Sequence, residues 1–264
     1  MLSVKKPSDG VRTLQFHRKE STLPAAARPS PGSNRLFRTE LWRTPPPYAE
    51  WHIIAALTGG LALDVCLGWR GQLAADLWVS ALFAWLLLKG GGIEKRALLT
   101  CLTIAGFGEA FLSLGWGLYD YQFRNIPVFV PPGHALLMTL GILIARRIPA
   151  WAIWLVPAAA LPYVMFGLWQ GWDRTGALLF AVFLACLVSS KARSLYATMF
   201  VLALLLELYG TWLGNWTWRP LVPWLTLSNT NPPACSGAFY CVLDLLVLAS
   251  MRMLIGDGKT TGTR

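Results

Sequence analysis

The chain has 264 residues, of which 55% are hydrophobic and 14% are charged, and its formal net charge is +10. Ordinary soluble domains hold about 25% charged residues, and disordered chains are poorer in apolar residues, so this composition excludes both classes. An all-α, polytopic membrane protein is the class that remains. The 14 Trp and 17 Pro agree with it, because Trp gathers at membrane interfaces and membrane helices tolerate Pro.

Residues 1–50 differ from the rest of the chain. They are rich in Lys, Arg, Pro, Ser and Ala and end near Pro45-Pro46-Pro47. Such a segment has little to bury, so we expect a basic, disordered cytosolic tail. No apolar segment near Met1 suggests a signal peptide.

Eight apolar stretches follow this tail, of which the fourth and sixth are short. Stretches of this kind are long enough to cross a hydrocarbon core of about 30 Å as helices. We therefore expect a bundle of about eight transmembrane helices. The stretches lie at approximately 51–69, 72–88, 97–119, 132–145, 149–169, 175–190, 195–213 and 234–253.

The basic residues sort to one side of this predicted bundle. Of the 23 Lys and Arg, only Arg70, Arg124, Arg174 and Arg219 fall in the odd-numbered connections between spans. The others fall in the even-numbered connections and at the two ends. By the positive-inside rule, we expect a multi-pass protein of the inner (cytoplasmic) membrane with both termini in the cytosol.

The two halves of the membrane region repeat one order of features. Each has two helices, a basic connection, a helix with one Glu, an aromatic loop ending in Pro-Pro, and a final helix. With four helices each, two copies would enter the membrane in the same orientation. We expect repeat 1 at 51–148, repeat 2 at 149–255 and a cytosolic tail at 256–264; chance similarity between apolar segments is the alternative. The matching residues are Glu109, Gly115, Tyr119, Tyr121 and Pro131-Pro132 in the first half, and Glu207, Gly214, Trp216, Trp218 and Pro232-Pro233 in the second.

Two glutamates lie at the same predicted depth in the membrane. Glu109 and Glu207 are each about 12 residues into their spans, which places both slightly beyond the midplane toward the outer face. A carboxylate there costs several kcal/mol unless it is neutral, paired or hydrated, so such residues often mark functional sites. We predict that both are catalytic; a structural Glu bonded to a nearby Trp, Tyr or carbonyl is the alternative.

Two aspartates, Asp64 and Asp244, also lie inside predicted spans. They are candidates for further polar walls of the same cavity, and we include Asp244 in the predicted catalytic set. A capping or packing role is the alternative for both.

The outer loops concentrate aromatic and turn residues. Gly and Pro would fold these loops back toward the membrane edge, and Trp and Tyr offer an apolar face with one polar edge. We expect the loops to bind the substrate; an interfacial aromatic belt, and for His134 a bonded helix-end residue, are the alternatives. The predicted substrate-binding residues are Trp116, Tyr119, Tyr121, His134, Trp212, Trp216, Trp218, Asn229 and Asn231.

The sequence predicts neither a cofactor nor a metal. Its three His lack an HxxxH spacing, its five Cys are scattered, and P-loop, dinucleotide-binding and GxSxG motifs are missing. The basic tail offers too little for a nucleic-acid role. The expected partners are the lipid bilayer and a membrane lipid or isoprenoid substrate.

Two short blocks resemble a known family. The stretch Glu109…Gly115-Trp116-Gly117-Leu118-Tyr119-Asp120-Tyr121…Pro127 resembles the Glu…Gly-x-x-Gly-x-Tyr-x-Tyr…Pro element of the membrane carotenoid-biosynthesis family that includes the bisanhydrobacterioruberin hydratases. Gly214-x-Trp216-x-Trp218…Pro223…Asn229 is similar to that family's Gly-x-Trp-x-Trp…Pro…Asn element. The spacing after Gly115 differs, and Glu207 stands for an Asp expected in the later helix.

The resemblance implies a polytopic enzyme that protonates a terminal alkene of an acyclic isoprenoid and adds water, with Glu109 or Glu207 as the acid. The residues fit this chemistry independently, because a buried carboxyl is a suitable acid and aromatic faces stabilise a developing cation. A second carboxylate would orient the water, and no cofactor is needed. Two other functions remain open. One is a proton- or cation-coupled transporter whose halves move around a midplane site, and the other is a non-catalytic membrane scaffold.

Overall fold

The computed structural model describes residues 41, 42 and 44–256. The predicted tail at 256–264 lies outside the described residues except for Gly256, and most of the predicted tail at 1–50 lies outside them too. The expected disorder does not hold for the described end of the N-terminal tail. Leu41 and Trp42 are only 2% and 4% exposed, because the Arg146 guanidinium donates to both of their carbonyl oxygens and the Glu94 carboxylate accepts the Trp42 N–H.

Helices make up most of the described chain. Six helical segments are long and apolar enough to cross a membrane, whereas α4 and α6 are apolar but have only 16 residues each. The predicted helical fold, with several helices that could cross a membrane, is confirmed in this form. The elements are α1 (Ala49–Cys66), α2 (Trp69–Lys89), α3 (Gly92–Glu109), the π-helix η2 (Ala110–Gly115), β1 (Tyr119–Tyr121), α4 (Val130–Ala145), the 3-10 helix η3 (Ala152–Trp154), α5 (Leu155–Gln170), α6 (Arg174–Ser189), α7 (Arg193–Leu213), β2 (Trp216–Trp218) and α8 (Gly237–Gly256).

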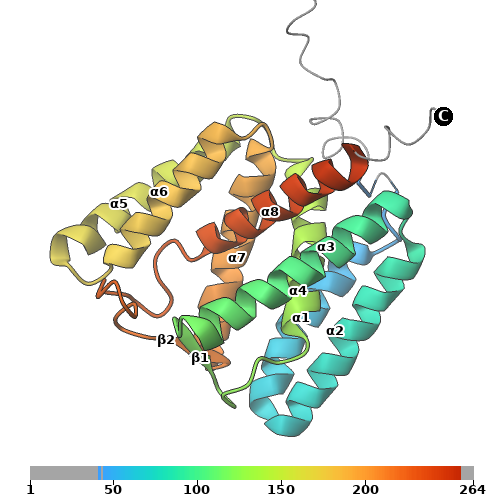
Figure 1. The fold of residues 1–264 in the computed structure, drawn as a ribbon, viewed down its shortest axis with the longest axis horizontal. Coiled ribbons are helices and arrows are strands. Elements are labelled where there is room, and N and C mark those ends of the chain that lie inside the picture. The colour runs from blue at the N-terminus through green and yellow to red at the C-terminus, as the bar shows by residue number, and fades with distance from the viewer. Residues whose placement is uncertain (1–40, 43, 257–264) are drawn as a thin grey trace, which may run out of the picture. The chain divides into compact units, whose positions relative to one another are not determined.

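Four helices form the centre of this bundle. α4 packs against α3 and α7, and α8 packs against the same two helices. Figure 1 shows α3 and α8 crossing in front of α4 and α7. α4 is apolar around its whole circumference, and nearly all of its residues are buried, as expected for a helix surrounded by protein. The hairpin α1–α2 covers α4, and the hairpin α5–α6 packs on α8 through α6.

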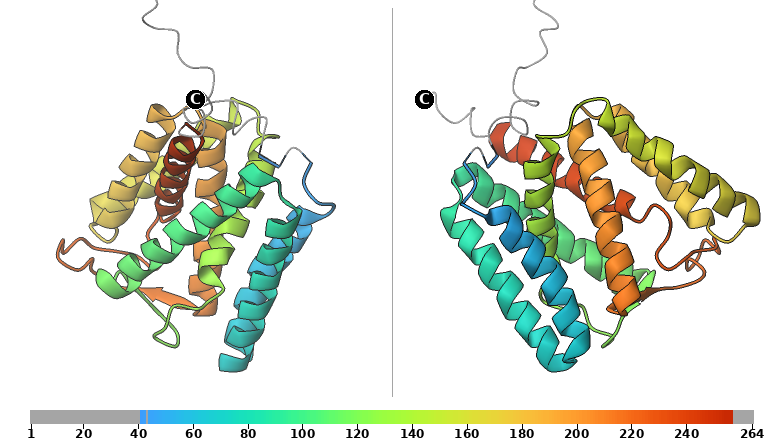
Figure 2. Two further views of the ribbon diagram at one scale, coloured as in Figure 1. Left: turned by 45° about the vertical axis from the view of Figure 1, so that its right-hand side comes forward. Right: turned by 180° about the vertical axis from the view of Figure 1, so that it is seen from behind.

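A two-stranded sheet joins the two halves of the chain at one end of the bundle (Figure 2). β1 and β2 are antiparallel, with Tyr119 opposite Trp218 and Tyr121 opposite Trp216. Side chains alternate between the two faces of a strand, so these four aromatic residues point into the bundle while Asp120 and Thr217 point outward. Both segments belong to the predicted outer loops, and the structure instead forms a short strand in each.

Candidate acid–base site between α3, α4, α7 and α8

Glu109 ends the regular part of α3 and is 7% exposed. Its Oε2 accepts hydrogen bonds from the hydroxyls of Tyr119, at 2.6 Å, and Tyr121, at 2.7 Å. Its Oε1 lies 3.0 Å from Nε2 of His134. Three polar groups therefore hold this carboxyl in one orientation.

Glu207 occupies the corresponding place on α7 and is 6% exposed. Its Oε2 accepts the indole N–H groups of Trp216, at 2.9 Å, and Trp218, at 3.0 Å. The Tyr240 hydroxyl from α8 lies 3.3 Å from Oε1. The two glutamates are thus held in the same manner, but only Glu109 contacts an imidazole, that of His134.

The strand pair explains how one short sheet serves both carboxyls. Each strand follows the helix that carries its glutamate, and its two inward side chains reach back to that carboxyl. The return from helix to strand needs left-handed backbone, which Gly117 and Gly214 supply with φ of 72° and 93°. Antiparallel pairing then brings the tyrosines of β1 against the tryptophans of β2, with the Tyr119 and Trp218 ring centroids 4.8 Å apart.

Tyr119 and Tyr121 stay protonated as donors to Glu109. Burial raises the pKa of both phenols well above the ordinary value, and the adjacent Glu109 carboxyl adds to the effect. Both hydroxyls therefore keep their protons throughout the neutral range.

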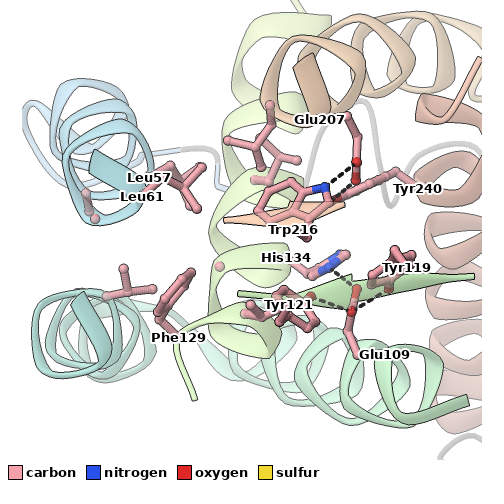
Figure 3. A pocket seen from close by; sticks show the side chains of 17 residues that line it. Leu57, Leu61, Glu109, Tyr119, Tyr121, Phe129, His134, Glu207, Trp216 and Tyr240 are labelled. Atoms are coloured by element: carbon pink, nitrogen blue, oxygen red, sulfur yellow. Dashed lines mark hydrogen bonds and ion pairs between the residues drawn. The ribbon is translucent and has the colours of Figure 1, made fainter. Parts of the chain in front are cut away.

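His134 and Tyr240 connect the two carboxyls. Their rings stack with centroids 4.6 Å apart and an interplanar angle of 12°. α4 begins at Val130 with Pro131 and Pro132 in its first turn, where a missing N–H costs nothing, and His134 follows one turn later. The result is a continuous polar row in the order Glu109, His134, Tyr240, Glu207, seen in Figure 3.

Two cavities meet at this row. The small cavity, of about 50 Å³, reaches from the row toward α1 and α2 and is bounded by Leu57, Leu61 and Phe129, among others. The second cavity, which we call the cleft, has a volume of about 680 Å³. Both cavities are lined by Glu109, Glu207, His134, Tyr119 and Tyr240.

The cleft runs between α3, α6, α8 and the loop after β2. Apart from the residues of the row, its lining is overwhelmingly apolar. Several lining side chains are also exposed on the outer surface, including Phe107 at 76% and Leu246 at 50%. The cleft therefore extends from the surface that lipid would contact to the two carboxyls.

The structure brings together some predicted site residues and not others. Glu109, Glu207, Tyr119, Tyr121, His134, Trp216 and Trp218 form the site. Trp116 lines the cleft and donates its indole N–H to the Pro223 carbonyl. The Asn231 side chain accepts the Trp218 backbone N–H, so it holds β2 from outside the cavities.

Four other predicted candidates lie away from both cavities. Trp212 is 79% exposed, and the Asn229 amide donates to the Arg219 carbonyl. Asp64 accepts a hydrogen bond from Asn215. Asp244 is fully buried, with neither oxygen bonded within the described chain. The expected further polar walls from Asp64 and Asp244 are therefore not found, because neither lines a described cavity.

Sequence reasoning missed Tyr240, which touches both halves of the row. The one sequence feature that could have pointed to Tyr240 is its position on α8, one helical turn before the buried Asp244. Within residues 44–256, no group of three His, Cys, Asp or Glu side chains is arranged to hold a metal ion.

Comparison of this chain with protein-family models, curated proteins and solved structures finds no match.

Proposed function

We propose that the chain is an integral membrane enzyme that acts on a long apolar lipid or isoprenoid by acid–base chemistry. The reaction class is protonation of a terminal trisubstituted alkene followed by addition of water. One observation carries the proposal: two buried carboxyls from α3 and α7 lie at the inner end of an apolar cleft of about 680 Å³. Cavities of this size commonly enclose a small-molecule ligand, and an apolar lining selects a hydrocarbon chain.

The surroundings of Glu207 suit a proton donor. Its contacts are two indole N–H groups and one phenol, all of which are neutral. A buried carboxyl without an adjacent cation is more easily kept as the neutral acid, and the neutral acid is the form that can protonate an alkene. Glu109 contacts His134 directly, so we assign Glu207 as the acid.

The aromatic walls suit the cation that protonation would form. Tyr119, Trp218 and Tyr240 all line the cleft next to the carboxyls. Aromatic faces attract cations by about 0.5–1 kcal/mol each at exposed sites and by about 2 kcal/mol or more when water is excluded. A tertiary carbocation at the end of the cleft would be stabilised in this way without a metal or cofactor.

We propose that the site lies in the outer half of an inner (cytoplasmic) membrane, with both chain termini in the cytosol. The distribution of Lys and Arg between the connections supports this orientation. We count eight crossings, since α4 and α6 alternate in direction with the six longer helices. The shortness of α4 is compatible with a membrane because protein surrounds this helix.

The arrangement also supports two like-oriented four-helix repeats. α3 contacts α8 as α7 contacts α4, and α2 lies on α4 as α6 lies on α8. The register of β1 and β2 is symmetric about Asp120 and Thr217. A two-fold axis along the membrane normal would relate such halves.

The resemblance to the carotenoid-biosynthesis family bears on the same residues. Its Gly-x-Tyr-x-Tyr and Gly-x-Trp-x-Trp elements coincide with the strands whose side chains bond Glu109 and Glu207. We therefore propose an acyclic, carotenoid-like isoprenoid as the substrate class.

A turnover assay tests the proposal. Full-length protein in proteoliposomes would be given an acyclic polyene with terminal isopropylidene groups in ¹⁸O-labelled water. We expect a product heavier by one labelled water, and loss of that product in Glu207→Gln and Glu109→Gln. Glu50→Gln, which changes an ion pair with Arg147 far from the site, is the matched control. An unchanged polyene with the wild-type protein, or full activity of both site variants, would overturn the proposal.

A further inference from the structure

His134 has one ring nitrogen bonded and one unbonded. Nε2 lies 3.0 Å from Oε1 of Glu109, whereas the buried Nδ1 has no hydrogen-bond partner within the described chain. The residue is only 9% exposed. An unpaired polar atom in such a place costs about 1–3 kcal/mol unless a ligand or water completes it.

The bond to Glu109 fixes which nitrogen carries the hydrogen. With Glu109 ionised, its carboxylate offers only acceptors, so the contact of Oε1 with Nε2 then requires an N–H on Nε2. In a neutral imidazole the other nitrogen is then an acceptor with a free lone pair. Stacking on Tyr240 fixes the plane of the His134 ring.

The two cavities beside His134 determine which molecules can reach the lone pair of Nδ1. The residue lines both the small cavity and the apolar cleft. A cavity needs roughly 10–15 Å³ to hold one water molecule, so the small cavity of about 50 Å³ is large enough for water. Glu109, Glu207 and the site tyrosines give such waters polar partners, whereas the cleft lining is almost entirely apolar.

We infer that Nδ1 of His134 is the catalytic base that activates a water molecule held in the small cavity, and that Glu109 is its positioning residue. The inference rests on the proposed function and deepens it by assigning the water site and the base. Glu109 is the poorer base of the two, because three donors already occupy its oxygens. A carboxylate bonded to the far nitrogen also stabilises the imidazolium that forms.

The step balances without an oxidant or reductant. The carboxyl proton of Glu207 forms a new C–H bond with the electron pair of the alkene, which leaves a tertiary cation and the Glu207 carboxylate. The water oxygen forms the C–O bond while one of its O–H bonds breaks, and Nδ1 takes that proton. The imidazolium then returns a proton to Glu207 through water in the cavity that both residues line, and the net change is one water added.

Nitrogen-15 NMR of histidine-labelled, full-length protein in lipid nanodiscs tests the tautomer directly. The chain has three His, at 17, 52 and 134, so the His17→Gln/His52→Gln background leaves one signal pair. We expect a protonated Nε2 and an unprotonated Nδ1. A proton on Nδ1 with an unprotonated Nε2 would overturn the assignment, and this measurement needs no substitution at the site.

Turnover of the acyclic polyene separates this inference from the proposed function. His134→Gln keeps an amide N–H able to reach Glu109 but removes the basic nitrogen, so kcat should fall about 10²–10⁴-fold while polyene binding is retained. A wild-type-like rate in His134→Gln overturns the base assignment and leaves the proposed function standing. A wild-type protein that adds no water overturns both. Thermal melting of the variant in detergent shows whether a low rate reflects unfolding.

Discussion

The two tyrosine hydroxyls on one oxygen of Glu109 should contribute to stability in a non-additive way. Tyr119→Phe and Tyr121→Phe each remove a hydroxyl that donates to Oε2 and keep the ring that packs in the core. In either single variant the oxygen retains one donor. In the double variant it retains neither of these donors, although the carboxyl is only 7% exposed.

The magnitude follows from those contacts. A hydrogen bond to a charged group contributes about 1.5–3 kcal/mol, so each single variant should lower the free energy of unfolding by roughly that amount or somewhat less. Leaving Oε2 without a donor adds the cost of an unpaired buried carboxylate. We therefore expect the double variant to lose more than the sum of the singles, with a coupling energy of about 0.5–3 kcal/mol.

Reversible SDS titration in mixed micelles, followed by far-UV circular dichroism, would measure the four free energies of the cycle. Trp216→Phe and Trp218→Phe form a matched second cycle, because both indoles donate to one oxygen of Glu207. Additivity within about 0.5 kcal/mol in the tyrosine cycle would refute the idea that the hydroxyls share one acceptor.

Three further predictions concern the loops and the sheet. Asp173→Ala should destabilise the protein by about 1–3 kcal/mol in the same titration, because this carboxylate caps α6 through the Gly176 N–H and also accepts the Ala234 N–H; an unchanged midpoint would contradict this. Gly210→Ala should lower kcat, since the added Cβ would fall inside the Trp216 indole that donates to Glu207, whereas Gly108→Ala, which meets open space, should leave the Trp216 position unchanged. Folding raises the pKa of Tyr119 and Tyr121, so their contribution to the free energy of unfolding is complete below the unfolded pKa near 10 and declines as pH rises above it. The Tyr119→Phe/Tyr121→Phe variant should therefore lose less stability than the wild type at high pH. Identical pH profiles of the two proteins would contradict this prediction.

Local patterns in the sequence were sufficient to predict where the helices lie and to single out the two glutamates. Glu109 and Glu207 stand out because a carboxyl within an apolar span is costly unless the fold satisfies it. The short fourth and sixth stretches correspond to α4 and α6, whose lengths reflect their hydrophobic runs.

The bonds that define the site could not be read from local patterns. The pairing of Tyr119 with Trp218 joins segments almost a hundred residues apart, and three residues are too few for a recognisable strand pattern. The role of His134 depends on its contact with Glu109, which comes from another helix. The local sequence around Tyr240 does not show that its ring stacks on His134. Trp42 looked like part of a polar tail, and only the distant Glu94 and Arg146 explain its burial.

The most direct test of the central claim is mass spectrometry of the lipid retained in the cleft. Gly108 lines the cleft next to Glu109, and a Cβ there would meet no atom within 4 Å, so we expect Gly108→Leu to extend into the cleft and fill it without disturbing the helix. Gly92→Leu, at the far end of the same helix and equally unobstructed, is the control. We predict that wild-type protein and Gly92→Leu, purified from cells that make an acyclic polyene, retain that polyene, and that Gly108→Leu does not. Equal retention by all three proteins, or none by the wild type, would contradict a carboxyl pair that acts on an apolar chain.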